Sequence, residues 1–125
     1  MSIVYDAGVL VAADRGERRV WADHQARLEA GILPATTSPV VAQVSRSAGQ
    51  AQLRRFLRGC HMVGFATDDA HRVGSLLAEA GTSDVVDAHV VTVAVSLHAA
   101  IVTSDPSDLR RLAEAAPTPV RVLPI

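Results

Sequence analysis

The stretch AAIVTSDPSDLRRL (residues 99–112) places two aspartates, Asp105 and Asp108, directly after an apolar run typical of a buried strand. The stretch IVYD (residues 3–6) has the same arrangement at the start of the chain, with Asp6 after its apolar run. If both runs are parallel strands, their carboxyl ends share one edge of a sheet, and open α/β sheets bind ligands at that edge. Carboxylates collected there favour a hard divalent cation, and such a cation favours phosphate chemistry.

The composition is that of an ordinary globular chain. Of its 125 residues, 49% are hydrophobic and 20% are charged, which excludes a disordered chain and predicts one domain over residues 1–125. Charged residues or histidines interrupt every long apolar stretch, so we expect no membrane partner. The chain begins without the features of a secretory signal, and Cys60 is its only cysteine. We therefore expect a cytoplasmic protein.

The charges are unusual in kind but balanced in number. All 12 basic residues are arginines, and the formal net charge of −1 gives no global attraction to nucleic acid. A GC-rich genome is the simplest reason for the missing lysines, and arginine also suits bidentate contacts with phosphate. Four aromatic residues are too few for the base-stacking platforms of common RNA-binding modules.

Strand-like and helix-like segments alternate from end to end. The predicted strands are Ser2–Tyr5, Ile32–Thr36, Met62–Phe65, Ala99–Thr103 and Val120–Leu123. The predicted helices are Ala7–Ala13, Glu17–Ala30, one opened by Ser38 and Pro39, Gln50–Arg58, Asp68–Ala80 capped by Thr67, Asp84–His98 and Asp105–Ala115. This alternation predicts an α/β fold whose parallel sheet is covered on both faces.

The segment Asp84–His98 is apolar on nearly every face. Its valines would tolerate a strand, but its length favours a helix. A helix that is apolar all round must be buried against the sheet or against a partner subunit. The apolar surface exceeds what one sheet face is expected to cover, so we predict a homodimer.

Two aspartate pairs can serve a purely structural purpose. Asp84 with Asp87, and Asp105 with Asp108, can each be an N-cap followed by an acidic first turn. Adding Asp6 at a third strand-to-helix junction weakens that interpretation. Two unit charges 4 Å apart repel by about 4 kcal/mol at an effective dielectric constant near 20. Several such pairs require either a cation between them or protonated carboxyls.

The order of four short motifs resembles the PIN domain, in particular the VapC-like ribonuclease toxins of type II toxin–antitoxin systems. The motifs are IVYDAGVLVA, SPVVAQVSR, SDVVDAHVVTVA and IVTSDPSDLRRL, and together they extend over essentially the whole chain. The resemblance implies a PIN-like three-layer α/β/α sandwich with a central parallel sheet. It also implies an Mg²⁺- or Mn²⁺-dependent ribonuclease that forms a homodimer and has a cognate antitoxin.

The resemblance also implies site residues. Asp6, Asp87 and Asp105 match the acidic positions that hold the metal and act in catalysis, while Asp84, Asp108 and Thr103 are supporting positions. One position departs from the pattern, because Gln43 occupies the place of a usual glutamate on the helix that starts near Ser38. Gln43 can offer a neutral oxygen or a hydrogen bond, but it cannot supply a negative charge.

Three functions compete on the sequence alone. The leading hypothesis is a metal-dependent endoribonuclease acting on RNA, with Arg15, Arg18 and Arg46 as candidates for phosphate contact. The alternative is a degenerate PIN domain that binds protein or RNA without catalysis, which Gln43 favours. A phospho-receiver domain also gathers aspartates at strand ends, but it needs a lysine and this chain has none.

Overall fold

The computed structural model describes all residues, 1–125, and has one central sheet of five parallel strands. The strand order across the sheet is β3-β2-β1-β4-β5. The strands are β1 (Ser2–Tyr5), β2 (Ala35–Thr37), β3 (His61–Val63), β4 (Ala99–Thr103) and β5 (Val122–Pro124). The sheet therefore has the parallel arrangement that the alternating sequence pattern predicts.

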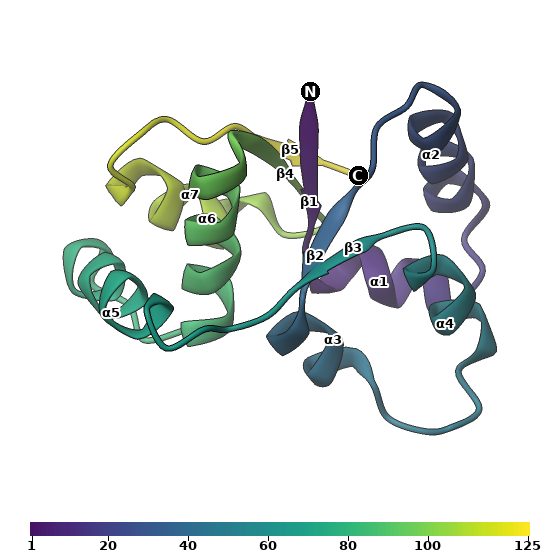
Figure 1. The fold of residues 1–125 in the computed structure, drawn as a ribbon, viewed down its shortest axis with the longest axis horizontal. Coiled ribbons are helices and arrows are strands. Elements are labelled where there is room, and N and C mark those ends of the chain that lie inside the picture. The colour runs from purple at the N-terminus through teal and green to yellow at the C-terminus, as the bar shows by residue number, and fades with distance from the viewer.

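Seven helices surround the sheet and make a three-layer sandwich (Figure 1). Helices α5, α6 and α7 lie on one side, α1, α2 and α4 lie on the other, and α3 lies below the sheet in the view of Figure 1. The helices are α1 (Ala7–Asp14), α2 (Arg18–Glu29), α3 (Ser38–Val44), α4 (Ala51–Leu57), α5 (Asp69–Ala80), α6 (Val85–Leu97) and α7 (Pro106–Ala115). The predicted three-layer α/β/α fold with a central parallel sheet is confirmed.

The register between the two central strands decides where the aspartates lie. Tyr5 at the end of β1 pairs with Val102 of β4, and the Asp6 amide donates to the Val102 carbonyl at 3.1 Å. Asp6 is therefore level with Thr103, the last residue of β4. The chain leaves both strands at this carboxyl edge, and α6 also begins there (Figure 1).

Three strand boundaries were predicted wrongly. The second strand begins at Ala35 and not at Ile32, because Gly31 turns with a φ of +79° and Pro34 has no amide to donate. The third strand is shifted to His61–Val63. The last strand is shifted to Val122–Pro124, since Ile101 of β4 pairs with Val122.

Two helix caps also differ from the prediction. Thr37, and not Ser38, caps α3, because the Thr37 hydroxyl accepts a hydrogen bond from the Val40 amide at 3.2 Å. Asp68, and not Thr67, precedes the first residue of α5. In each case the cap is the polar residue next to the predicted one. Both neighbours are residue types that cap helices, so the side-chain type alone does not tell which of them is the cap.

The apolar helix α6 is mostly covered within one chain. Six of its thirteen residues are buried and four more are half-buried, and the helix packs against α5, α7 and the central strands. Its exposed apolar side chains are at the two ends, Val85 and Leu97. The sheet and helices of a single chain thus cover more of this helix than its sequence led us to expect. No helix in the chain is both long enough and apolar enough to cross a membrane.

Candidate active site

Asp6 is a buried carboxylate with one oxygen left unpaired. It follows β1 and precedes α1, and its side chain is only 8% exposed. The Thr103 hydroxyl donates to Asp6 Oδ2 at 3.0 Å, but Asp6 Oδ1 is buried without a hydrogen-bond partner. Buried polar atoms normally find partners, so this oxygen marks a place where a ligand would be favourable.

Thr103 ties the two central strand ends together. Its hydroxyl, fully buried, donates to Asp6 and accepts a hydrogen bond from the Asp105 amide at 3.0 Å. Asp105 itself is exposed, and the Ser107 hydroxyl donates to its Oδ1 at 3.1 Å. One threonine therefore sets both the carboxylate of Asp6 and the turn that carries Asp105 into α7.

Asp84 and Asp87 stand at the start of α6. The Asp84 side chain accepts a hydrogen bond from the Asp87 amide at 3.0 Å and caps the helix, as the sequence allowed. Asp87 is in the first turn and half-buried, and its carboxylate makes no hydrogen bond. The capping role thus accounts for Asp84 but leaves the Asp87 carboxylate without a structural partner.

The carboxylates act on one another electrostatically. Burial is the main cause of the raised pKa of Asp6, and the nearby carboxylates of Asp84 and Asp105 raise it further, against the hydrogen bonds from Ala7 and Thr103. Burial raises the pKa of Asp87 to about 7, and the charges of Asp84, Asp6, Asp108 and Asp105 add to the effect. The structure therefore brings all five aspartates into one field of negative charge, which we call the carboxylate cluster.

The donor chemistry of the carboxylate cluster fits a hard divalent cation. As the side chains are placed, no three His, Cys, Asp or Glu groups are arranged to hold one metal ion. The unpaired Asp6 oxygen, the unbonded Asp87 carboxylate and their raised pKa values nevertheless describe negative charge that is poorly compensated by the protein. Oxygen donors of this kind suit Mg²⁺ and Mn²⁺ better than softer metals.

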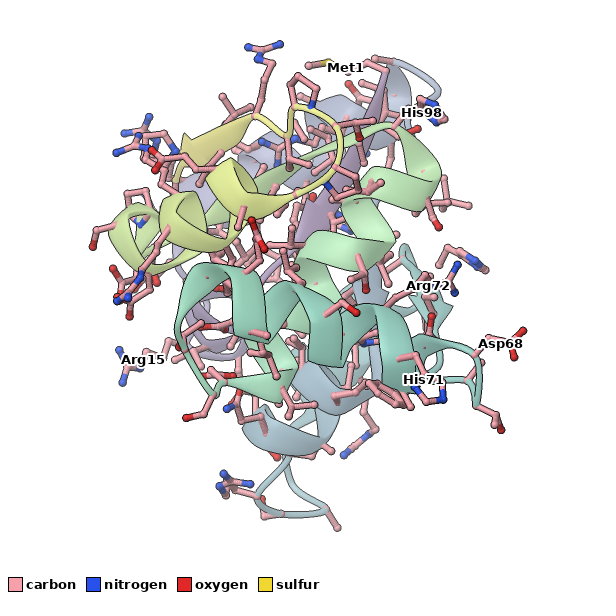
Figure 2. The ribbon with its side chains drawn as sticks, turned by 90° about the vertical axis from the view of Figure 1, so that its left-hand side faces the viewer. Met1, Arg15, Asp68, His71, Arg72 and His98 are labelled. Carbon is pink, nitrogen blue, oxygen red and sulfur yellow. The ribbon has the colours of Figure 1, made fainter.

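The remaining predicted site residues lie outside this network. Gln43 is exposed on α3, and its side chain makes no hydrogen bond. Arg15 and Arg18 are exposed beyond the end of α1, and Figure 2 shows Arg15 projecting away from the ribbon. The Arg46 guanidinium folds back onto the end of α3, where it donates to the carbonyls of Ala42 at 3.3 Å and Ser45 at 3.0 Å.

Gly8 is a residue of the site that the sequence analysis missed. A Cβ on Gly8 would overlap Ser104 Oγ and would lie 2.6 Å from Ser104 Cβ. Only glycine lets the first turn of α1 approach the turn after β4 this closely. The signal in the sequence was a glycine two residues after Asp6, which by itself is equally typical of an ordinary turn.

Comparison with known proteins supports the fold. The chain resembles one chain in the crystal structure of VapBC2 from Rickettsia felis bound to a DNA fragment from their promoter. The TM-score is 0.77 at 18% identity, over 100% of this chain and 99% of the other. It also resembles PAE2754 from Pyrobaculum aerophilum, with a TM-score of 0.59 and 20% identity over 97% and 92% of the two chains. No protein-family model and no curated protein matches the sequence.

Proposed function

We propose that this protein is a metal-dependent endoribonuclease of the VapC-like type, which cleaves phosphodiester bonds in RNA. The observation that carries the proposal is the unpaired oxygen of the buried Asp6, which lies at the carboxyl edge of the sheet with four further aspartates; the pKa of Asp87, raised to about 7, agrees with it. Such charge is stabilised best by Mg²⁺ or Mn²⁺. The likeness of the fold to a chain of the VapBC2 structure agrees with this function.

Each residue of the site has a distinct task in this proposal. Asp6, Asp87 and Asp105 would hold the cation, with Asp84 and Asp108 adding negative charge around it. When bound, the cation would stabilise charge on the scissile phosphate and lower the pKa of an attacking water. Thr103 would keep the Asp6 oxygen in place and the Asp105 turn in register, because it bonds to both.

The same comparison supports one proposed partner, an antitoxin. The name VapBC2 denotes a complex, and we propose that the present chain likewise has a cognate antitoxin protein. We also propose a homodimer, an RNA substrate and a cytoplasmic location. The aspartates of this site repel the phosphates of RNA. The bound cation and basic side chains therefore have to offset that repulsion before the substrate can bind.

Asp87→Asn tests the proposal directly. With Mn²⁺ we expect the wild type to cleave RNA on a gel, and we expect Asp87→Asn and wild type in EDTA to lose this activity by about 100-fold or more. Wild-type protein that cleaves equally well in EDTA would contradict metal dependence. RNA cut equally by wild type and Asp87→Asn would show that the nuclease is a contaminant or that the site is elsewhere.

Melting temperature gives a second readout that does not depend on activity. The pKa of Asp87 is raised from 3.8 to about 7 in the folded chain, so ionising it costs stability as the pH rises from about 4 to about 7. In EDTA at pH 8, Asp87→Asn should therefore be more stable than wild type, by about 1–2 kcal/mol after allowing for solvent screening. Mn²⁺ should raise the melting temperature of wild type much more than that of Asp87→Asn.

Gln43 favours a second candidate function, a non-catalytic binding module. If the site is degenerate, wild type should cleave no faster than Asp87→Asn, and Gln43→Glu should restore some cleavage. If the site is active, Gln43→Glu should strengthen Mn²⁺ binding, since another carboxylate attracts a dication. A Gln43→Glu variant that binds Mn²⁺ no better than wild type would show that this position lies outside the site.

A further inference from the structure

Positive charge is concentrated in one segment of this nearly neutral chain. Residues 15–58 contain eight arginines against three carboxylates, whereas residues 59–125 contain four arginines against eight. The first segment thus has a net charge of +5 and the second a net charge of −4. Asp6 and Asp14 supply the remaining two negative charges. The overall value of −1 hides this separation and by itself indicates no attraction to nucleic acid.

Many of these arginines gather where α1, α3 and α4 come together. The Gln50 amide group links this region, because it donates to Asp14 Oδ2 and to the Val44 carbonyl, both at 3.0 Å, and its Oε1 accepts from the Arg46 amide at 2.7 Å. Gln52 lies beside Gly16, and its Oε1 accepts from Arg55 at 3.1 Å. We call the surrounding exposed set the arginine corner, which consists of Arg15, Arg18, Arg46, Arg54, Arg55 and Arg58.

The arginine corner is not neutralised by ion pairs. None of its six guanidiniums forms a salt bridge, although pairs are present elsewhere at Arg19 with Asp23 and at Arg72 with Asp69. Several corner arginines are held by neutral partners instead: Arg54 bonds to the Ala48 carbonyl, and Arg55 lies 4.7 Å from the centre of the Trp21 ring. These contacts hold the guanidinium groups in place and leave other N–H donors of each group free.

Helix dipoles account for part of this charge. Arg15 follows α1, Arg46 follows α3, and Arg54 is in the last turn of α4, so each arginine stabilises a helix carboxyl end. Three helix ends contribute about half a negative charge each. Asp14 and Glu17 add two more negative charges to the region. Six arginines outweigh these terms by about 2.5 positive charges, so capping does not account for the whole corner.

The arginine corner and the carboxylate cluster lie at opposite ends of one short helix. Asp6 immediately precedes α1 and Arg15 immediately follows it. A helix of eight residues is about 12 Å long, which a few nucleotides of a single strand can span. A chain bound at the corner can therefore place one of its phosphodiester bonds at the cluster, where the aspartates alone would repel it.

We propose that the arginine corner binds the phosphates of single-stranded RNA and delivers the strand along α1 to the carboxylate cluster. This inference deepens the proposed ribonuclease function and rests on it for the identity of the substrate. Guanidinium groups bind phosphate oxygens in pairs and keep their charge at any physiological pH, which suits sequence-independent holding of a backbone. The cluster performs the chemistry, and the corner supplies affinity.

RNA binding measured in EDTA tests the corner apart from catalysis. The probe is a fluorescein-labelled twelve-nucleotide uridine RNA, followed by anisotropy at several salt concentrations. Arg15→Gln/Arg54→Gln should bind at least about tenfold more weakly than wild type, and the slope of log K against log salt should fall by about 1.4, or about 0.7 per lost contact. The matched control Arg110→Gln/Arg121→Gln removes the same charge from exposed positions outside the corner and should change both values little.

The outcomes separate this inference from the nuclease proposal. If Arg15→Gln/Arg54→Gln binds RNA as wild type does, or no worse than the control pair, the corner is not the RNA site. If labelled polyglutamate binds at the corner while RNA does not, the partner is an acidic protein and the inference is wrong. If wild type does not cleave RNA but the corner variant still binds RNA more weakly than wild type, the arginine corner is an RNA-binding site and only the nuclease proposal is wrong. With an active enzyme, the corner variant should raise KM and leave kcat unchanged.

Discussion

At the scale of single residues, the chemistry of the carboxylate cluster depends on one hydroxyl group. Thr103 is fully buried, yet its Oγ1 donates to the aspartate that follows β1 and accepts from a backbone amide in the turn after β4. Those two groups are 99 residues apart in the chain, at Asp6 and Asp105. A hydroxyl is well suited to this position because it can donate to a carboxylate while it accepts from an amide.

Thr103→Val should therefore cost more than the loss of one ordinary hydrogen bond. The substitution keeps the shape of the side chain but leaves Asp6 with a second unpaired oxygen and Asp105 with an unpaired amide. We expect a loss of about 1–3 kcal/mol in the free energy of unfolding. We also expect a further rise in the pKa of Asp6, because the bond from Thr103 now lowers it.

Urea unfolding at pH 8 measures the change, with Thr103→Ser as the matched control. Serine keeps the hydroxyl, so it should retain most of the stability lost in the valine variant. A valine variant as stable as wild type, with the loss confined to the serine variant, would mean that the buried methyl group, and not the hydrogen-bonding hydroxyl, makes the contribution. In that case Thr103 would be a packing residue and not a positioning residue of the site.

At the scale of elements, the sequence predicted the type and order of every strand and helix but not all of their ends. A buried strand such as Ala99–Thr103 consists of consecutive, mostly apolar residues, so it can be recognised directly in the sequence. The ends depend on details of single backbone groups, as at Pro34, where the missing amide delays β2 to Ala35. The register between β1 and β4 joins distant segments, so no local pattern could reveal that Asp6 meets Thr103.

The candidate site shows the same division. The aspartates were identified because each follows a strand-like run or begins a helix-like one, a pattern that is visible in the sequence. Gly8 was missed because its role is a close approach to Ser104, which is ninety-six residues away. The extent to which α6 is covered was also not predictable, because it depends on how α5 and α7 pack around it.

The packing of α5 against α6 places a histidine where it cannot be protonated easily. His89 is fully buried, both of its ring nitrogens lack hydrogen-bond partners, and the Phe65 ring lies 4.8 Å away. The nearest charge is Asp69 Oδ2, 3.6 Å from Nε2, and Asp69 is itself paired with Arg72. Figure 2 shows Arg72 near the start of α5, beside Asp68 and His71. Burial lowers the pKa of His89, although Asp69 and the Gly64 backbone act in the opposite direction.

Acid should therefore loosen the contact between α5 and α6. The folded chain keeps His89 neutral while the unfolded chain protonates it below about pH 6.5, so stability should fall as the pH drops through that value. Each unit of difference between the two pKa values corresponds to about 1.4 kcal/mol. His89→Phe keeps a ring against Phe65 and removes the titration, so it should lose less stability than wild type when the pH falls from 7.5 to 5.

Urea unfolding at several pH values measures this difference directly. Asp6 and Asp87 have raised pKa values and contribute the opposite slope, so only the comparison between variants isolates His89. The exposed His71→Gln is the control and should follow wild type. Parallel pH curves for wild type and His89→Phe would mean that His89 is protonated as easily in the folded chain as in the unfolded one.

At the scale of the whole molecule, the fold places a negatively charged region and a positively charged region at opposite ends of α1. The carboxylate cluster concentrates negative charge at the carboxyl edge of the sheet, and the arginine corner concentrates positive charge beyond α1. A net charge of −1 is therefore a balance between distinct surfaces and not a sign of a featureless one.

The remaining apolar surface leads to the prediction of a homodimer. A groove of about 560 Å³ lies between α5, α6 and the segment after α7. Leu76, Val95, Ala115, Ala116 and Pro117 form its apolar part, and polar side chains, among them Arg72 and Glu79, form the rest. Leu97, 38% exposed, follows at the end of α6. An isologous contact across this region would bury both copies of the groove at once, and a stable interface needs about 1,200–2,000 Å² in total.

Light scattering after size exclusion at micromolar concentration measures the assembly. Wild type should have twice the chain mass of 13.2 kDa. Leu97→Glu should shift the protein toward one chain mass, because a carboxylate at an apolar contact loses its hydration. The control Leu33→Glu alters a more exposed leucine, 62% exposed in the segment before β2, and should leave the dimer intact. A wild type with the mass of one chain would contradict the homodimer prediction. It would mean that packing against α5 and α7 within one chain is enough to cover the apolar surface of α6.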